Sequence, residues 1–394
     1  MVDLAGWVAA LDELVELISG RFWRVEPRRR VGTYLRGLLA GLERKNGWTL
    51  AEHAGAVSPD GMQRLLRTAG WDVDGVRDDV RGYVLQHLGD DRTGVFVVDD
   101  TGFIKKGIRS AGVARQYTGT TGKVDNCQIG VFLAYASSKG RALVDRELYL
   151  PTAWTEDRDR CTRAGVPDEV GFATKPQLGI AMLDRAHRAG MLAGSWVTAD
   201  EAYGQNPTFR SWLATHGMPF VLATRNDDVL TSPDGQRRQA KVLATIAGTA
   251  ADGWERRSIG PGAHGERDYD WTAIALDTAG LPDGWGHWLL VRRQTRPGEG
   301  KKYRDLAFYR CAGPQATPLR ELIRVAGARW AIEESFQAAK NEAGLDQYQV
   351  RDYRAWHAHI TLAMAAAAYL AATRATAHEN KGGEKGDLQP AVTA

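Results

Sequence analysis

The chain has 394 residues, 43% of them hydrophobic and 25% charged, which is ordinary for a globular protein of two or three folding units. Its formal net charge of +3 neither demands nor excludes a nucleic-acid partner. Three widely separated cysteines (Cys127, Cys161 and Cys311) exclude a zinc cluster and a disulfide scaffold and indicate a reducing compartment. The apolar run at 360–372 is too short to span a bilayer and no signal sequence is visible, so we expect a soluble, cytoplasmic protein.

Residues 1–92 are predicted to form a helical DNA-binding domain, because apolar residues recur in them at three- and four-residue spacing. A helix, a turn and a second helix over WTLAEHAG and SPDGMQRLL are typical of a small DNA-binding unit, and a helical cap on the main domain is the alternative. The stretch from 21 to 45 is strongly basic. We expect its arginines to contact DNA phosphates, foremost Arg28, Arg29 and Arg30.

Residues 93–224 are predicted to form an α/β sheet, in which strands alternate with helices. One buried strand, GVFVVDD, ends in Asp99 and Asp100, and another, SWVTAD, ends in Asp200. A loop rich in glycine and basic residues follows the first of these strands, and it can approach a DNA backbone closely. Either DNA contacts or a merely solvated loop would explain its polar side chains, which are Lys105, Lys106, Arg115, Lys123 and Asn126.

Residues 225–312 are predicted to be a β-rich insertion, because helical periodicity is lost there. Four segments read as strands between Gly, Pro and Asp turns: WERRSIG, DYDWTAIALD, GHWLLVRRQTR and KKYRDLAFYRC. The insertion is rich in tryptophan, with Trp254, Trp271, Trp285 and Trp288. A tryptophan here could stack on a DNA base, and Trp288 is the first candidate, although core packing explains any one of them more simply.

Residues 313–377 return to helical patterning, and the small, polar tail at 378–394 is predicted to be disordered. One helix carries Glu333, with Arg329 one turn before it and Lys340 two turns after it. An exposed ion pair between Arg329 and Glu333 is the plain alternative, but it explains neither Lys340 nor the apolar residues that would seat the helix.

Three carboxylates, from two strand ends and one helix, are what a two-metal phosphoryl-transfer site needs. From their positions we favour Asp200 and Glu333 for this role, while the first strand leaves either Asp99 or Asp100 as the third acid. Adjacent acids cannot both point into one site. Alternation puts the side chains of adjacent strand residues on opposite faces, and adjacent helix residues are separated by about 100 degrees.

The motifs around these acids resemble the DDE transposases of bacterial insertion sequences, which carry a Y-x2-R-x3-E-x6-K signature. Arg329, Glu333 and Lys340 have the required spacing. VVDDTGFIKKG and VTADEAYG match the segments around the first and second aspartates, and ERKNGWTLAEHAG, KVDNCQIGVFLAY and GLDQYQVR also look like this group. The resemblance covers about residues 20–375. It departs at Ala326, where the signature has a tyrosine that is taken to assist phosphate positioning.

The resemblance implies a ribonuclease-H-like core, interrupted by the β insertion between the second and third acids. It implies that Asp100, Asp200 and Glu333 hold two Mg²⁺ or Mn²⁺ ions, and that Arg329 and Lys340 grip phosphates. The enzyme would cut double-stranded DNA at the terminal inverted repeats and join the freed 3′ end to target DNA. It would act as a homodimer in the synaptic complex, associated with the nucleoid and with no membrane. The rival interpretations are a catalytically silent DNA-binding regulator and a nuclease that does not join strands.

Overall fold

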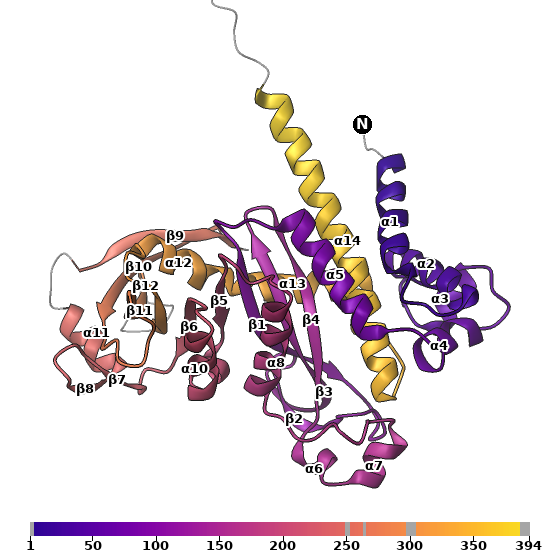
Figure 1. Ribbon diagram of the computed structural model, residues 1–394, viewed down its shortest axis with the longest axis horizontal. Coiled ribbons are helices and arrows are strands. Elements are labelled where there is room, and N and C mark those ends of the chain that lie inside the picture. Colours follow the sequence, from indigo (N-terminus) through magenta and orange to yellow (C-terminus); the bar gives the residue numbers. More distant parts are fainter. Residues whose placement is uncertain (1–3, 249–252, 263–264, 297–304, 387–394) are drawn as a thin grey trace, which may run out of the picture. The chain divides into compact units, whose positions relative to one another are not determined.

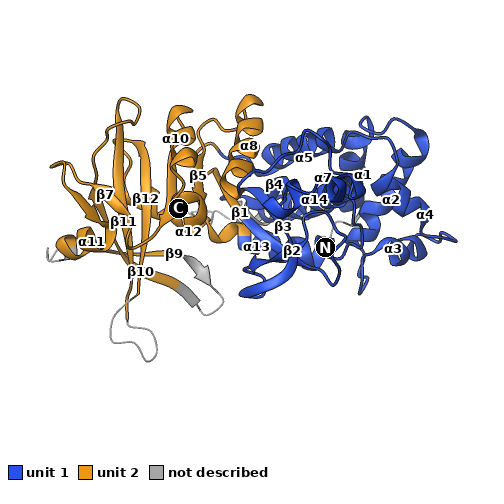
Figure 2. Ribbon diagram, turned by 90° about the horizontal axis from the view of Figure 1, so that it is seen from below, with its two compact units in different colours: residues 1–90, 100–174, 333–394 blue, residues 91–99, 175–332 orange. Residues whose placement is uncertain are grey.

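The computed structural model describes residues 4–248, 253–262, 265–296 and 305–386. The chain forms two compact units, coloured separately in Figure 2. Unit 1 contains Met1–Asp90, Asp100–Thr174 and Glu333–Ala394, and unit 2 contains Asp91–Asp99 and Lys175–Ile332. Two elements, β1 (Val95–Ile104) and α13 (Trp330–Ala343), run from one unit into the other. The domain limits predicted from the sequence stay a prediction.

The N-terminal part of unit 1 is helical, as predicted. Its helices are α1 (Leu4–Ser19), α2 (Val25–Leu39), α3 (Gly47–His53), α4 (Asp60–Arg67) and α5 (Val73–Leu88). Helices α1, α2, α4 and α5 contact the C-terminal helix α14 (Tyr353–Gly386), which Figure 1 shows beside α5. Tyr34 of α2 and His359 of α14 are joined by a buried 2.8 Å hydrogen bond. The helical part is therefore packed on the rest of unit 1, which agrees with the helical-cap interpretation and leaves DNA binding by α3 and α4 untested.

Helix α14 is the core helix of unit 1. Its alanine-rich middle, including Ala363, Ala365 and Ala366, is fully buried and packs against α5 and β4 (Gly140–Tyr149). Among the described residues this helix alone is long and apolar enough to cross a membrane, but most of the span is buried inside the protein. The helix continues to Gly386, so the part of the predicted disordered tail from 378 to 386 is helical, and 387–394 lie outside the described residues.

The sheet of unit 1 is antiparallel around β3 (Lys123–Ser137), which pairs with β2 (Ala114–Thr118) along residues 123–127 and with β4 along residues 129–137. This corrects the prediction of one long loop after the first aspartates. Strand β1 continues to Ile104, and the later part of the expected loop forms the β2–β3 hairpin, with Arg115 opposite Asn126. Alternation of exposed and less exposed residues in ARQYT is a strand pattern that the neighbouring glycines concealed. Two short helices follow, α6 (Thr152–Thr155) and α7 (Arg158–Arg163).

Unit 2 contains a mixed sheet. Residues 95–98 of β1 pair in parallel with β5 (Trp196–Ala199), and β5 pairs in parallel with β6 (Phe220–Thr224). The flanking helices are α8 (Lys175–Arg188), α9 (Glu201–Gly204), α10 (Pro207–Thr215) and α12 (Leu319–Ala328). Parallel strands joined through helices, followed by a β-rich segment and further helices, agree with the ribonuclease-H-like fold class predicted above.

The predicted β-rich insertion is confirmed, and its strands extend the sheet of unit 2. Beyond β6 the order is β12 (Leu306–Pro314), β11 (Trp285–Gln294), β10 (Gly265–Ala275) and β9 (Glu255–Gly262), all antiparallel. A small hairpin, β7 (Val229–Thr231) with β8 (Arg237–Gln239), lies outside this sheet. The expectation that helical patterning is lost throughout was wrong at α11 (Ala240–Gly248). Ala240, Leu243 and Ala244 are buried at helical spacing and pack on Leu289 and Val291 of β11.

Candidate functional site

The first two acidic motifs stand at the same end of two paired parallel strands. In unit 2, Val98 of β1 is in register with Ala199 of β5, and Asp99 and Asp200 are the residues that directly follow them. Asp100 is the next residue of β1. Asp99 and Asp100 are partly exposed, whereas the strand residues on both sides of them are buried. Carboxyl ends of parallel strands in an α/β sheet are a common place for a polar site.

Asp200 also shapes the turn that follows it. Its Oδ1 accepts hydrogen bonds from the backbone N–H groups of Ala202 (2.9 Å) and Tyr203 (3.4 Å), so the residue is the N-cap of α9. A capped helix start fixes the direction of the carboxylate. Gly204 completes this short helix against β6, where only glycine fits: a Cβ at this position would lie 1.9 Å from the carbonyl oxygen of Ala223.

Helix α13 carries Glu333 and is tied to β1 at two places. Within unit 2 the Arg329 guanidinium lies 3.9 Å from the Asp99 carboxylate. Within unit 1 Lys340 donates a 2.9 Å hydrogen bond from Nζ to Oγ1 of Thr101. Glu333 lies between these two cations along the helix, and it is exposed, while Asp100 lies between Asp99 and Thr101 along the strand. The two ties therefore hold the helix that carries Glu333 alongside the strand that carries Asp100.

Of the three apolar residues expected to seat α13, Trp330 is only partly buried. Ile332 and Phe336 are buried, and the Phe336 ring packs edge-on against Phe132 of β3 at 5.3 Å between centroids. The neighbouring acid Glu334 points to another partner, the Arg141 guanidinium of β4 at 2.5 Å. Adjacent acids on this helix thus have separate surroundings, as the geometry of a helix requires.

The acids are suitable donors for a hard divalent cation, because Mg²⁺ and Mn²⁺ prefer carboxylate oxygens. Asp100 and Glu333 belong to unit 1 and Asp200 to unit 2. Across the described ranges, no three His, Cys, Asp or Glu side chains form a ready-made metal-binding group. The residue types of these three acids therefore fit such ions.

The side chains predicted to bind phosphates differ in the contacts that they make within the protein. Arg329 and Lys340 contact the protein groups just described. Burial lowers the pKa of the Lys340 ammonium, and the nearby Asp346 opposes this. The Asn126 amide donates to the backbone carbonyl oxygens of Lys105 (2.6 Å) and Gly107 (3.0 Å), so this side chain holds the loop after β1 in place.

The arginines of α2 are only in part available to a ligand. Arg28 donates to the carbonyl oxygen of Phe22 at 3.0 Å, and Arg30 pairs with Glu26 at 2.9 Å on the same helix face. Arg29 is exposed. Arg115 and Lys123 lie on the β2–β3 hairpin instead of a loop.

Tryptophans of the insertion serve the core more than the surface. Trp271 is fully buried, and Trp254 packs against the core between α11 and β11. Trp288 is half-buried on β11, and its ring covers Gly286, where a Cβ would lie 2.2 Å from the indole. Ala326, at the position of the signature tyrosine, is buried on the inner face of α12, so no side chain there can replace the missing hydroxyl.

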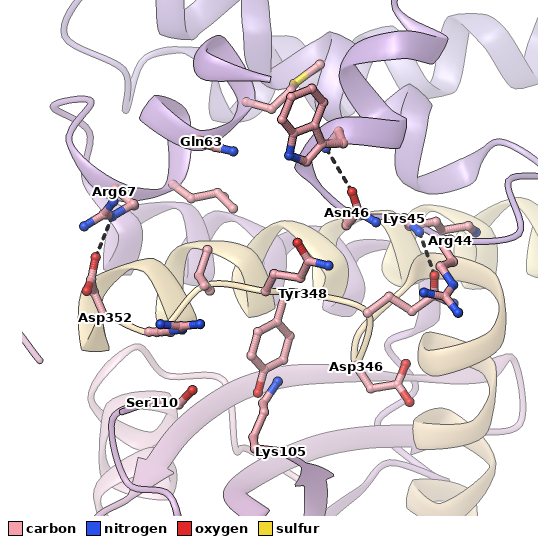
Figure 3. Close-up of a pocket in the computed structure, with 18 of the residues that line it drawn as sticks. Arg44, Lys45, Asn46, Gln63, Arg67, Lys105, Ser110, Asp346, Tyr348 and Asp352 are labelled. Atoms are coloured by element: carbon pink, nitrogen blue, oxygen red, sulfur yellow. Dashed lines mark hydrogen bonds and ion pairs between the residues drawn. The ribbon is translucent and has the colours of Figure 1, made fainter. Parts of the chain in front are cut away.

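Sequence reasoning missed a groove that lies entirely in unit 1 (Figure 3). It has a volume of about 1510 Å³ and three walls: residues 43–48 with 62–67, residues 104–110, and residues 346–352. Seven basic and three acidic side chains line it. Two of its walls contain strings that resemble the family without having been given a role, ERKNGWTLAEHAG and GLDQYQVR. These segments lie far apart in the sequence, so no local pattern predicts that they form one groove.

At the floor of the groove, Lys105 lies against the ring of Tyr348, with Nζ 3.5 Å from the ring centroid. Burial lowers the pKa of Lys105 to about 8, and the Asp346 carboxylate opposes this. The Tyr348 hydroxyl donates to Gln128 Oε1 at 2.8 Å and accepts from Trp356 Nε1 at 3.0 Å. A ring fixed in this way gives Lys105 a defined position.

Comparison with known proteins agrees with the motifs. The family model for DDE superfamily endonucleases matches residues 19–245, and the model for transposase DDE domains matches residues 173–370. A probable transposase for insertion sequence element IS701 from Microchaete diplosiphon is 26% identical over 323 residues, which are 80% of this chain and 75% of that protein. Together the two family models cover the strand ends, the insertion and α13.

Proposed function

The chain belongs to the transposases with a DDE domain, and from this premise we propose that it cuts and joins the ends of an insertion sequence with Asp100, Asp200 and Glu333. It is an enzyme that acts on DNA, a nuclease and strand transferase. The observation that carries the residue assignment is the pair of ties from α13 to β1, Arg329 to Asp99 and Lys340 to Thr101. These ties support the assignment of Asp100 and Glu333, and the β1–β5 register, in which Asp99 and Asp200 follow paired residues, supports the choice of Asp200.

Transposases of this superfamily generally use divalent metals. We propose two Mg²⁺ ions, replaceable by Mn²⁺, with Asp100, Asp200 and Glu333 as the protein ligands. Such ions supply an activated water and stabilise the oxygen that leaves phosphorus. The protein has to present the three carboxylates together, and the Asp200 cap and the two α13 ties fix the backbone from which each projects.

The two cations on either side of Glu333 then have a positioning role in this proposal. Lys340 and Arg329 orient the Glu333 helix through Thr101 and Asp99, and a phosphate near the cut would compete for the same donors. Joining two ends requires two active sites, so we propose a homodimer in the synaptic complex, with terminal inverted repeats as the DNA that it recognises. We place the protein in the cytoplasm, on the nucleoid.

A silent regulatory protein is not favoured, because the sequence keeps an acid in each of the three motifs and the similar protein is named as a transposase. A nuclease that does not join strands would differ from a transposase only in its products, which would contain cut DNA and no joined strands.

The test uses labelled duplexes taken from the DNA that flanks the gene, with Mg²⁺ or Mn²⁺. Glu333→Gln is compared with Glu334→Gln, a matched control because its side chain points to Arg141. We expect cleavage at the element end to fall by more than about 100-fold in the first variant and to persist in the second. Unchanged cleavage by Glu333→Gln, in protein that folds normally, would refute the residue assignment.

A further inference from the structure

The groove of unit 1 offers a surplus of positive charge that the protein itself does not neutralise. Four of its cations, Arg44, Lys106, Arg109 and Arg351, are exposed, and none forms an ion pair within the part of the chain that the structure describes. By contrast, Arg67 at the rim is paired with Asp352 at 2.6 Å (Figure 3). Four unpaired cations on three converging segments are a surface for a polyanion.

The same groove is also apolar, which a surface built for phosphates alone does not need. On its rim Trp48 is 64% exposed and Ile108 is 76% exposed. Its floor reaches the buried side chains of Tyr34, Met62 and Tyr348. The backbone of a DNA duplex presents only sugars and phosphates, so it gains nothing from an indole face. An unpaired base gains stacking and apolar burial.

Polar side chains able to read a base edge stand between the cations. Gln63 and Gln349 are exposed in the lining, and their amides can each donate and accept. Asn46 is not available in the same way, because its Oδ1 caps α3 through Trp48 N (2.9 Å) and Thr49 N (3.3 Å). That cap fixes the chain at the point where Trp48 projects.

The groove begins close to the proposed cut. Strand β1 leads from Asp100 to Ile104, and Lys105 and Lys106 follow directly. At about 3.3 Å per strand residue, Lys105 is roughly 17 Å from Asp100 along the chain. A strand released at the acid could therefore reach the groove within a few nucleotides.

We propose that this groove binds unpaired nucleotides of a DNA strand, with its four exposed cations on the phosphates and Trp48 stacked on a base. The inference rests on the proposed function for the choice of DNA over RNA. The binding surface itself is argued from the lining alone.

The test measures fluorescence anisotropy of a labelled oligothymidylate longer than about 16 nucleotides, without divalent metal, over a range of salt concentrations. The intact protein is compared with Arg109→Ala/Arg351→Ala and with Trp48→Ala. Their controls are Arg163→Ala, at an exposed arginine outside the groove, and Trp23→Ala, at a tryptophan that is 75% exposed. Circular dichroism confirms folding of each variant, and folding is expected because every substituted side chain is exposed.

We expect the double variant to lower the slope of log affinity against log salt by about 1.4, since each single-strand phosphate contact contributes about 0.7. Trp48→Ala should weaken binding by about 10-fold and leave this slope unchanged, because it removes stacking and no charge. Both controls should bind as the intact protein does. A duplex of the same length should bind less tightly through the groove, and oligouridylate should bind no better than oligothymidylate.

Other outcomes overturn the proposal. Binding that is equal in all variants would mean that the groove is not a nucleic-acid site. Loss of duplex affinity in the double variant, with no effect of Trp48→Ala on either DNA, would mean that the groove holds a duplex backbone. Preference for oligouridylate would exclude DNA as the ligand. Because metal is absent, these results are independent of cleavage: Glu333→Gln should bind normally, and a failure of the three-acid assignment would leave the groove result unaffected.

Discussion

Lys340 and Thr101, 239 residues apart in the chain, are joined by a 2.9 Å hydrogen bond from Nζ to Oγ1. The bond links α13, which carries Glu333, to the strand that carries Asp100. Thr101 is 8% exposed, so the Lys340 ammonium is directed at a buried hydroxyl. The resemblance implies that Lys340 binds a phosphate. In the protein without DNA, this lysine instead positions α13 through its contact with Thr101.

Lys340→Met should lower cleavage by about 10- to 100-fold, the range seen when a group that orients a ligand is removed, with little change in DNA affinity. The measurement is single-turnover cleavage beside duplex binding at several salt concentrations. Thr101→Val removes the acceptor and should give a loss of similar size, and the double variant should be no worse than either single one. If DNA affinity and its salt slope fall in Lys340→Met and not in Thr101→Val, the lysine contacts phosphate and is not a positioning residue.

Gly204→Ala should unfold the turn that holds Asp200. The added Cβ would meet the Ala223 carbonyl oxygen at 1.9 Å, and a backbone atom has no rotamer with which to move aside. We expect unfolding free energy to fall by about 1–3 kcal/mol, measured by denaturant titration. Gly82→Ala is the matched control, because nothing lies within 4 Å of a Cβ there, in the middle of α5. It should raise stability by up to about 1 kcal/mol, and an equal loss in both variants would contradict the steric argument.

The elements that carry the acids could be read from the sequence because their signals are local. Runs of buried β-branched residues mark β1 and β5, and an apolar stripe marks α13. The β2–β3 hairpin was missed because Gly119 and Gly122 break up a short strand pattern, and α11 was missed because it is one short helix among strands. Glycine and short length both weaken a periodic signal.

The surroundings of the site could not be predicted, because they depend on contacts between distant segments. Lys105 contacts Tyr348, and Arg329 lies near Asp99. The spacing of these residues in the sequence predicts neither contact. Local reasoning therefore found the strand ends and the helix, whereas the groove, which needs three walls from separate parts of the chain, required the structure.

His359 should make the protein sensitive to acid. It is buried, and its Nε2 lies 3.1 Å from the Gly344 carbonyl oxygen, which can only accept. Nε2 therefore carries the proton, and Nδ1 accepts from the Tyr34 hydroxyl at 2.8 Å. Burial lowers the pKa of His359 to about 4, and the positive charge of Lys105 adds to this. The neutral ring is the form that the folded protein holds.

The sign of the effect follows from linkage. The folded pKa lies below the unfolded value of about 6.5, so this contribution to stability is complete above pH 6.5 and is lost progressively as pH falls toward 4. The loss amounts to about 3 kcal/mol. Urea titrations between pH 7 and 4 should show a smaller acid loss for His359→Gln than for the intact protein. The same acid loss in both proteins would contradict the assignment of this effect to His359.

His287 should give unit 2 a similar sensitivity. Its Nδ1 lies 2.6 Å from the Asp277 carbonyl oxygen, and its Nε2 accepts from Arg310 at 3.0 Å. Burial lowers its pKa to about 4, with a smaller push from the charges of Arg310 and Arg210. Native-state hydrogen exchange should then show protection falling in both units as pH drops below about 6.5. A loss of protection confined to unit 1 would contradict the argument for His287.

Because of Lys105, the affinity of the groove for nucleotides should fall as the pH rises above neutral. The groups that face it are the Tyr348 ring, the Asp346 carboxylate, which favours its charge, and His359, which is neutral at this pH. Since the pKa of Lys105 is about 8 in the protein alone, the ammonium is lost as pH rises through that value, and its attraction for phosphate is lost with it. Affinity for oligothymidylate should therefore fall between pH 7 and 9.5. Lys105→Arg keeps the charge throughout and should bind with a much flatter pH profile. The same steep fall in both proteins would assign the titration to another group and leave Lys105 outside the binding surface.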